Sequence, residues 1–145
     1  MLENYKELDL LFEGLNKLTG VRDIAYHRFG EGRINPVLKT NTDILGVEKW
    51  KNAHANNPVY IQHDQLLSDI CREPRTLVVQ DVKNDPRSAD EFFLFGIDSI
   101  MIIPVLVQDD LKGIVVVASI GELHFFDDEE IEKSEQIVEQ YINIF

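Results

Sequence analysis

Two nearly continuous apolar runs dominate the pattern of hydrophobic and polar positions along this chain. The first covers residues 99–107 and the second residues 111–118, with polar residues between them. Two such runs joined by a short polar segment predict an antiparallel hairpin. Because consecutive rather than alternate positions are apolar, both faces of the sheet are expected to be covered. This hairpin is therefore the predicted centre of the fold.

The N-terminal part of the chain predicts a helix followed by a second hairpin. Apolar residues recur at helical spacing over residues 4–19, and Gly20 suits the left-handed residue that ends a helix. Strands are expected at 21–29 and 33–40, with a glycine-containing turn between them. A nucleotide-binding loop is excluded there, because its third glycine is missing and a strand follows instead of a helix. The apolar stripe of the helix is wide for its length, so we expect it to pack on its own sheet and on a second copy of the chain.

The middle of the chain offers weaker signals. Residues 41–60 are expected to be irregular, with Trp50 as their only large anchor. A helix is expected next, beginning either at Pro58, which suits a first helical position, or at Asp64 as an N-cap, and ending before Pro74. Its predicted buried stripe consists of Leu66, Leu67, Ile70 and Cys71.

The last elements carry clearer boundaries. A third strand is expected at 76–80, and a helix is expected to start at Pro86. After the central hairpin, residues 120–125 are expected to continue as a further strand. Asp127 and Glu130 have the spacing of a capping box and predict the start of the final helix.

Composition narrows the class of protein. A length of 145 residues with 44% hydrophobic residues fits one domain over 1–145, and the element order predicts an α+β fold with an antiparallel sheet and helices on both faces. The formal net charge of −12 argues against nucleic acid or an anionic membrane surface as a partner. No apolar run of about 18 residues is present, and the N-terminus has no signal-peptide pattern, so a cytoplasmic protein without a membrane span is expected.

Three motifs in the second half of the chain resemble those of the GAF domain, a small-molecule sensor module related to PAS domains. Residues 75–87 are similar to its strand and DV…DPR loop, residues 96–105 to its G-(I/V)-x-S…P-(L/V) strand, and residues 113–129 to its G-(V/L)…F-(T/S)-x-E-(E/D) ending. The motifs follow the family's order, whereas the first half of the chain fits in element order only. The resemblance covers the region from residue 66 to residue 145.

The resemblance implies a cavity between one face of the sheet and the segment 50–97. The helices at 4–19 and 128–145 would lie on the other face and pair with a second copy to form a homodimer. The implied function is a non-catalytic sensor of a small polar metabolite or anion, whose terminal helices signal to a histidine kinase or a nucleotide cyclase. The residues that this placement predicts to bind the ligand are Trp50, Tyr60, Leu67, Ser68, Asp81, Arg87, Phe95, Ile97 and Ser99.

Residues that could carry catalysis or hold a metal are sparse. Cys71 is the only cysteine, and on a buried helix stripe it is expected to be inert. No nucleophile motif or metal-ligand spacing is present, so neither an enzyme nor a metal site is expected, and no cofactor can be named. The four histidines are interpreted as separate surface or half-buried residues: His27, His54, His63 and His124.

Two further interpretations of the cavity remain open. The helix start near Asp64 could direct backbone N–H groups at nitrate or a carboxylate, as in free-standing nitrate-receptor GAF proteins, or Asp64 could cap that helix itself and leave no site. The domain could also be a structural dimerisation or interaction module. In that case the pocket would be filled by its own side chains, Phe92, Phe93 and Phe95.

Overall fold

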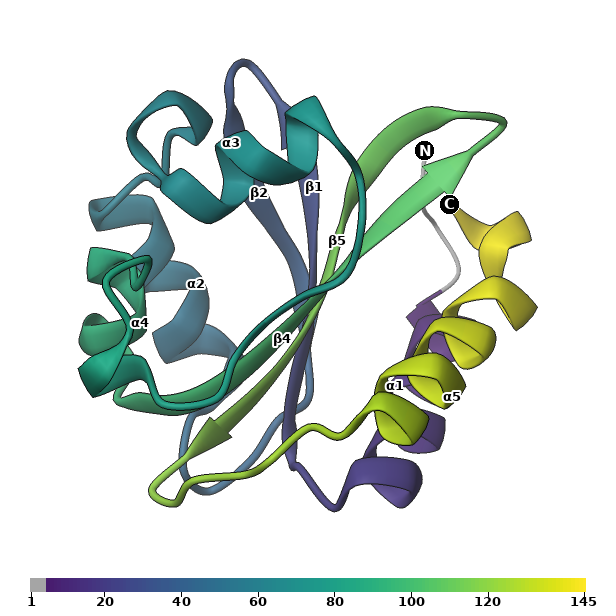
Figure 1. The fold of residues 1–145 in the computed structure, drawn as a ribbon, viewed down its shortest axis with the longest axis horizontal. Helices are drawn as coiled ribbons and strands as arrows, with labels where there is room; N and C mark the ends of the chain where they lie inside the picture. The colour runs from purple at the N-terminus through teal and green to yellow at the C-terminus, as the bar shows by residue number, and fades with distance from the viewer. Residues whose placement is uncertain (1–4) are drawn as a thin grey trace.

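A five-stranded antiparallel sheet forms the middle layer of the computed structural model, which describes residues 5–145 (Figure 1). The strand order is β2-β1-β5-β4-β3, so the predicted hairpin of β4 and β5 is confirmed near the centre of the sheet. The strands are β1 (Asp23–Gly30), β2 (Arg33–Lys39), β3 (Leu77–Val79), β4 (Ile97–Val107) and β5 (Asp110–Ile120).

The continuous apolar runs of β4 and β5 arise because each strand contributes to two cores. Met101 pairs with Val117, and both belong to the core under the terminal helices. Ile102, the next residue, belongs instead to the core on the opposite face. Successive side chains of a strand point to opposite faces, so a sheet covered on both sides requires apolar residues at every position.

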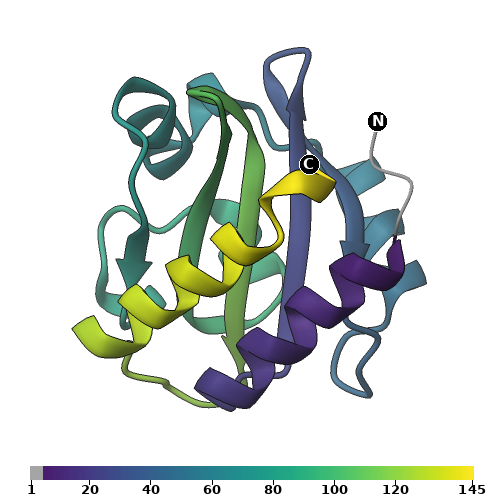
Figure 2. The same ribbon diagram turned by 90° about the vertical axis from the view of Figure 1, so that its right-hand side faces the viewer.

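The helices α1 (Tyr5–Thr19) and α5 (Asp128–Gln140) cover one face of the sheet and lie side by side across it (Figure 2). The expected helix at 4–19 is confirmed over the described residues, and its first residue lies outside them. Gly20 has a left-handed φ of 76°, as predicted for the end of α1. The Asp127 carboxylate accepts the Glu130 N–H at 2.8 Å, which confirms the predicted start of α5.

The opposite face is covered by shorter segments (Figure 1). Both predicted features of the fold class, the antiparallel sheet and helices on both of its faces, are therefore confirmed. The segments are α2 (Val47–Asn56), α3 (Gln65–Arg72), α4 (Asp90–Leu94) and the 3-10 turns η1 (Ile61–His63) and η2 (Val82–Asn84); a third turn, η3 (Ile142–Ile144), follows α5.

The prediction that residues 41–60 are irregular was wrong, because α2 occupies the middle of this segment. Its buried stripe consists of Trp50 and His54 only, and a stripe with one apolar member leaves no detectable hydrophobic period. Asp64 is the N-cap of α3, so the alternative start at Pro58 was wrong. Residues before α3 instead form a bridge between Tyr60 and Arg33.

Three other expectations were wrong. Pro86 does not start α4, because the preceding Asp85 carboxylate accepts the Arg87 N–H in a local turn and the helix begins at Asp90. The strand expected at 120–125 is absent, since β5 ends at Ile120 and Gly121 turns the chain with a φ of 93°. Cys71 is exposed rather than buried on α3.

None of the helices within residues 5–145 combines the length and the apolar character needed to cross a membrane.

Candidate functional site

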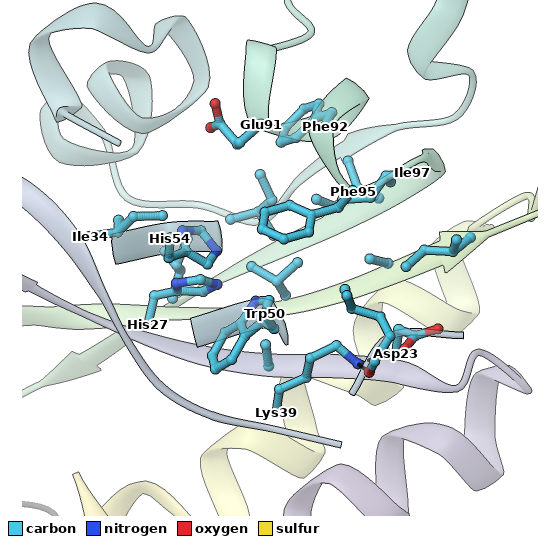
Figure 3. A pocket seen from close by; sticks show the side chains of 18 of the residues that line it. Asp23, His27, Ile34, Lys39, Trp50, His54, Glu91, Phe92, Phe95 and Ile97 are labelled. Carbon is cyan, nitrogen blue, oxygen red and sulfur yellow. Dashed lines mark hydrogen bonds and ion pairs between the residues drawn. The ribbon is translucent and has the colours of Figure 1, made fainter. Parts of the chain in front are cut away.

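A narrow cavity of about 60 Å³ lies between the sheet and the layer formed by α2, α3 and α4 (Figure 3). Its floor is apolar, because β4 and β5 direct isoleucine, valine and alanine side chains toward it. Trp50 and His54 of α2 form one wall, and Phe92 and Phe95 close the side nearest α4. The floor residues are Ile97, Ile100, Ile102, Ile114, Val116, Ala118 and Ile120.

Two buried histidines meet at this cavity, one from β1 and one from α2. The ring centroids of His27 and His54 are 4.9 Å apart, and Trp50 contacts both rings at 5.2 and 5.5 Å. Burial lowers the pKa of His54 to about 4, and burial together with the charge of His54 holds the pKa of His27 well below its usual range. Both imidazoles are therefore neutral at pH 7. The interpretation of these two as separate residues was wrong.

His27 also presents a polar atom that the protein does not satisfy. Its side chain is 4% exposed, and Nδ1 has no hydrogen-bond partner within the described part of the chain. A buried polar atom without a partner is unfavourable by roughly 1–3 kcal/mol, so such atoms are uncommon in folded proteins. Because His27 lines the cavity, a ligand there can supply the missing partner.

A pair of carboxyl groups forms another polar part of the lining. Asp64 is 5% exposed, and its Oδ1 accepts the Leu67 N–H at 3.1 Å as the cap of α3. Burial, followed by a hydrogen bond to Asp64 and the charge of that group, raises the pKa of Glu91 to about 9. Glu91 therefore carries a proton at pH 7, and it can share this proton with Asp64 Oδ2, which no other donor in residues 5–145 reaches.

The buried ion pair at the other end of the cavity is already saturated. Lys39 Nζ donates to Asp23 Oδ1 at 2.6 Å and to the carbonyl oxygens of Thr40 and Leu45 at 2.9 and 2.8 Å. Burial lowers the pKa of Lys39, whereas the hydrogen bond and charge of Asp23 act in the opposite direction. All three ammonium protons have protein acceptors, so this lysine ties β1 and β2 to the following loop rather than binding a ligand.

The structure divides the residues predicted to bind a ligand into three groups. Those that line the cavity are Trp50, Leu67, Phe95 and Ile97. Those that line a separate outer groove are Tyr60 and Arg87. The others make local hydrogen bonds outside the cavity lining: Ser68 to the Ile61 carbonyl, Asp81 to Asn84 and Ser99 to the Gln80 carbonyl. A ligand-binding role for any of the nine stays a prediction.

Sequence reasoning missed most of the polar lining, namely Asp23, His27, Lys39, His54 and Glu91. The available signal was a set of polar residues inside otherwise buried strands and helices, although their partners lie far away along the chain. The described residues contain no group of three or more His, Cys, Asp or Glu side chains arranged to hold a metal ion.

Hydrogen bonds connect the cavity wall to the start of α5. Ser99, two residues after the cavity-lining Ile97, accepts the His124 N–H at 2.9 Å. The Gln80 side chain donates to the Phe126 carbonyl at 2.8 Å and accepts the Phe126 N–H at 2.9 Å. Phe126 immediately precedes the cap residue Asp127, so a displacement of the β3 and β4 ends would be passed to the first turn of α5.

Comparison with known proteins gives a consistent result. The sequence model of the GAF domain matches residues 6–143. The structure is similar to a GAF domain/HD domain protein from Geobacter sulfurreducens, with 19% identity and a TM-score of 0.76 over 94% of this chain and 88% of that chain. It is also similar to the photoproduct state of a GAF domain from Synechocystis sp., with 18% identity and a TM-score of 0.76 over 95% of this chain and 90% of that chain.

A third similar structure is a domain from a protein proposed to be a two-component sensor histidine kinase of Sinorhizobium meliloti. It is 15% identical, with a TM-score of 0.72 over 99% of this chain and 91% of that chain. None of the curated proteins compared with the chain matches it. At these identities the structural similarity shows a shared fold, and the predicted family resemblance is confirmed by the match over residues 6–143.

Proposed function

This chain belongs to the GAF domain family, and from that premise we propose that it is a non-catalytic sensory domain that binds a small polar ligand in the cavity beneath α2–α4. GAF domains are generally sensory modules rather than enzymes. The observation that carries the proposal is that His27 lines the cavity and has a buried Nδ1 atom without a hydrogen-bond partner in residues 5–145. A bound ligand could form the hydrogen bond that no protein group makes to this atom.

The charges around the cavity favour a neutral or cationic ligand over an anion. Asp64 itself caps α3, so its carboxylate occupies the position where an anion would meet the helix N-terminus. The Lys39 ammonium has no free proton to donate, and both histidines are neutral at pH 7. These features argue against a nitrate-receptor-like function for this domain.

We propose that a ligand in the cavity shifts β4 and that this shift changes the position of α5. Ser99 and Gln80 bind the segment that precedes α5, and α5 lies against α1 on the far side of the sheet. Ligand binding would change the signal only if it favoured one arrangement of these helices over another. We also propose that α1 and α5 form the contact with a second copy of the chain in a homodimer. In this proposal the signalling partner is a cytoplasmic histidine kinase or nucleotide cyclase.

A structural module with a self-filled pocket is the second candidate. The observation in its favour is the small volume of about 60 Å³, which Phe92 and Phe95 help to restrict. That space suits a ligand of only a few heavy atoms, since it is less than half of the roughly 150 Å³ of an engineered cavity that binds benzene. The two candidates differ in whether any small molecule stabilises the fold.

The test is native mass spectrometry for a co-purified ligand, followed by thermal unfolding against a panel of small amines, alcohols, amides and acids. Ala118→Leu fills the cavity floor, whereas Ala55→Leu adds the same side chain to an exposed position of α2. A cavity ligand should raise the melting temperature of the wild type and of Ala55→Leu but not of Ala118→Leu. If no compound stabilises the wild type and no ligand co-purifies, the self-filled module is correct.

A further inference from the structure

Two hollows on the α2–α4 side of the molecule share the same two carboxyl groups. The inner hollow is the cavity, and the outer one is a groove of about 660 Å³ between residues 57–65 and 86–94. Asp64 and Glu91 are the residues common to both linings. In Figure 3 the Glu91 side chain lies above the cavity, on the same side as Phe92 of α4. The carboxyl pair therefore forms the partition between the groove and the cavity.

We propose that this partition is the binding site for a small primary alkylammonium ion, which enters from the groove, places its head group between Asp64 and Glu91 and lays its alkyl chain on the apolar floor. The inference rests on the proposed sensory function and names the ligand class of that same cavity. It depends on the two carboxyl groups that line an apolar cavity and on the buried Asp64 Oδ2, which has no hydrogen-bond partner in residues 5–145.

The carboxyl pair needs one positive partner, and the protein provides none. The buried Asp64 and the half-buried Glu91 are close enough that ionisation of both is unfavourable without a cation, so a shared proton fills that role in the free protein. An ammonium group has three donors and a full positive charge, which allows both carboxylates to ionise. Binding then transfers the Glu91 proton to solvent, and no covalent bond forms or breaks.

The other charged and titratable groups facing the pair leave this preference in place. His27 of β1 and His54 of α2 are neutral, and Lys39 of β2 is bound to Asp23 of β1. Asp90 of α4 adds negative charge near Glu91. In the groove, Arg87 is paired with Asp85 at 2.7 Å, and His63 lies beside Tyr60.

The cavity volume and lining set the length and polarity of the ligand. A volume of about 60 Å³ holds a chain of a few carbon atoms over the isoleucine-rich floor. Burial of each additional methylene stabilises a complex by about 0.8 kcal/mol until the space is full. His27 adds an imidazole to this lining, with which a second polar group on a ligand could bond.

The test is isothermal titration calorimetry of the full chain with propylammonium chloride at pH 7.5, in phosphate and in MOPS buffer. The two buffers have different ionisation enthalpies, so the difference between the binding enthalpies measured in them gives the number of protons released on binding. We expect binding that releases close to one proton, whereas 1-propanol and propionate bind at least about tenfold more weakly. Glu91→Gln should weaken propylammonium binding about tenfold and abolish proton release, while the exposed α2 variant Glu48→Gln should do neither.

Each other outcome overturns the inference in a distinguishable way. Binding of propylammonium without proton release in the wild type excludes the exchange at the carboxyl pair, even if Glu91→Gln fails to fold. Equal or tighter binding of 1-propanol or propionate excludes an ammonium site but leaves a cavity ligand in place. Absence of propylammonium binding excludes alkylammonium ions as the ligand class. The proposed sensory function is excluded only if none of the small molecules in the thermal-unfolding panel stabilises the protein either.

Discussion

The imidazole rings of His27 and His54 lie 4.9 Å apart with an interplanar angle of 70°, one on the sheet and the other on α2. Trp50 packs against both rings, so two titratable groups are held in the apolar layer between the sheet and the helices (Figure 3). Protonation of either ring would place a positive charge beside the other in a buried site. This arrangement links the packing of α2 to pH.

We predict that the contribution of His54 to the stability of the fold falls as the pH drops below 6.5. The pKa of His54 is lowered from 6.5 to about 4 in the folded protein, so the unfolded chain binds more protons between these values. The contribution of His54 to the free energy of unfolding should therefore decrease across this window, by about 3 kcal/mol once pH 4 is reached, and it is measured as the difference between the wild type and His54→Phe. Urea unfolding of the wild type, His54→Phe and the exposed-site control His63→Phe at pH 7 and pH 4.5 measures it. An equal pH dependence in all three proteins would contradict the prediction.

Glu91 should have the opposite pH dependence. Its folded pKa of about 9 exceeds the ordinary value of 4.5, so the folded state binds more protons between these values, and stability is lost as the pH rises through this window. Glu91→Gln keeps a donor for Asp64 and removes the ionisation, so we expect it to stabilise the protein by roughly 2–3 kcal/mol at pH 7.5. The gain should disappear at pH 4. Urea titrations at both pH values test this against Glu48→Gln, and a destabilised Glu91→Gln at pH 7.5 would show that the carboxyl pair is ionised.

The features that could be predicted from the sequence are those encoded by neighbouring residues. The apolar runs of β4 and β5 identify a sheet covered on both faces, and Asp127 with Glu130 marks the start of α5, because each signal is contained within one element. The cavity could be anticipated only through the family resemblance. Its wall at α2 was missed because a stripe formed by Trp50 and His54 carries too little hydrophobic periodicity.

The polar contacts of the site require strand register and helix packing, which local patterns do not encode. His27 faces the cavity because β1 pairs with β5 in the register that sets it opposite Ile114. Glu91 meets Asp64 because the short helix α4 and the start of α3 line the same groove. Tyr60 and Arg87 are close in sequence to cavity residues but lie in the outer groove, because the packing of the helices rather than the local sequence decides which hollow a side chain lines.

Gly113→Ala should destabilise the fold strongly. A Cβ atom at this position of β5 would lie 2.2 Å from the His27 carbonyl oxygen and 2.9 Å from the Tyr26 ring, so β1 would have to move. We expect a loss of about 3 kcal/mol in the free energy of unfolding, together with altered packing of His27. Gly14→Ala in α1 is the matched control, because its Cβ would make an ordinary 3.4 Å contact with Ile137 of α5 and alanine favours the helix, so it should stabilise the protein by up to about 1 kcal/mol. Chemical denaturation measures both values, and a neutral Gly113→Ala would show that the two strands separate easily.

Gln80→Ala tests whether the segment before α5 is held by the sheet. This side chain makes two hydrogen bonds to the Phe126 backbone, at 2.8 and 2.9 Å, and so connects the residue after β3 with the residue before the α5 cap. Loss of both bonds leaves the buried Phe126 N–H and carbonyl without these partners, so we expect a decrease of about 1–3 kcal/mol in the free energy of unfolding. Hydrogen exchange should accelerate at Phe126 and in the first turn of α5, while β1 amides keep their protection. The exposed-site variant Gln62→Ala is the control, and unchanged exchange at Phe126 in Gln80→Ala would mean that the core contacts of Phe126 alone position α5.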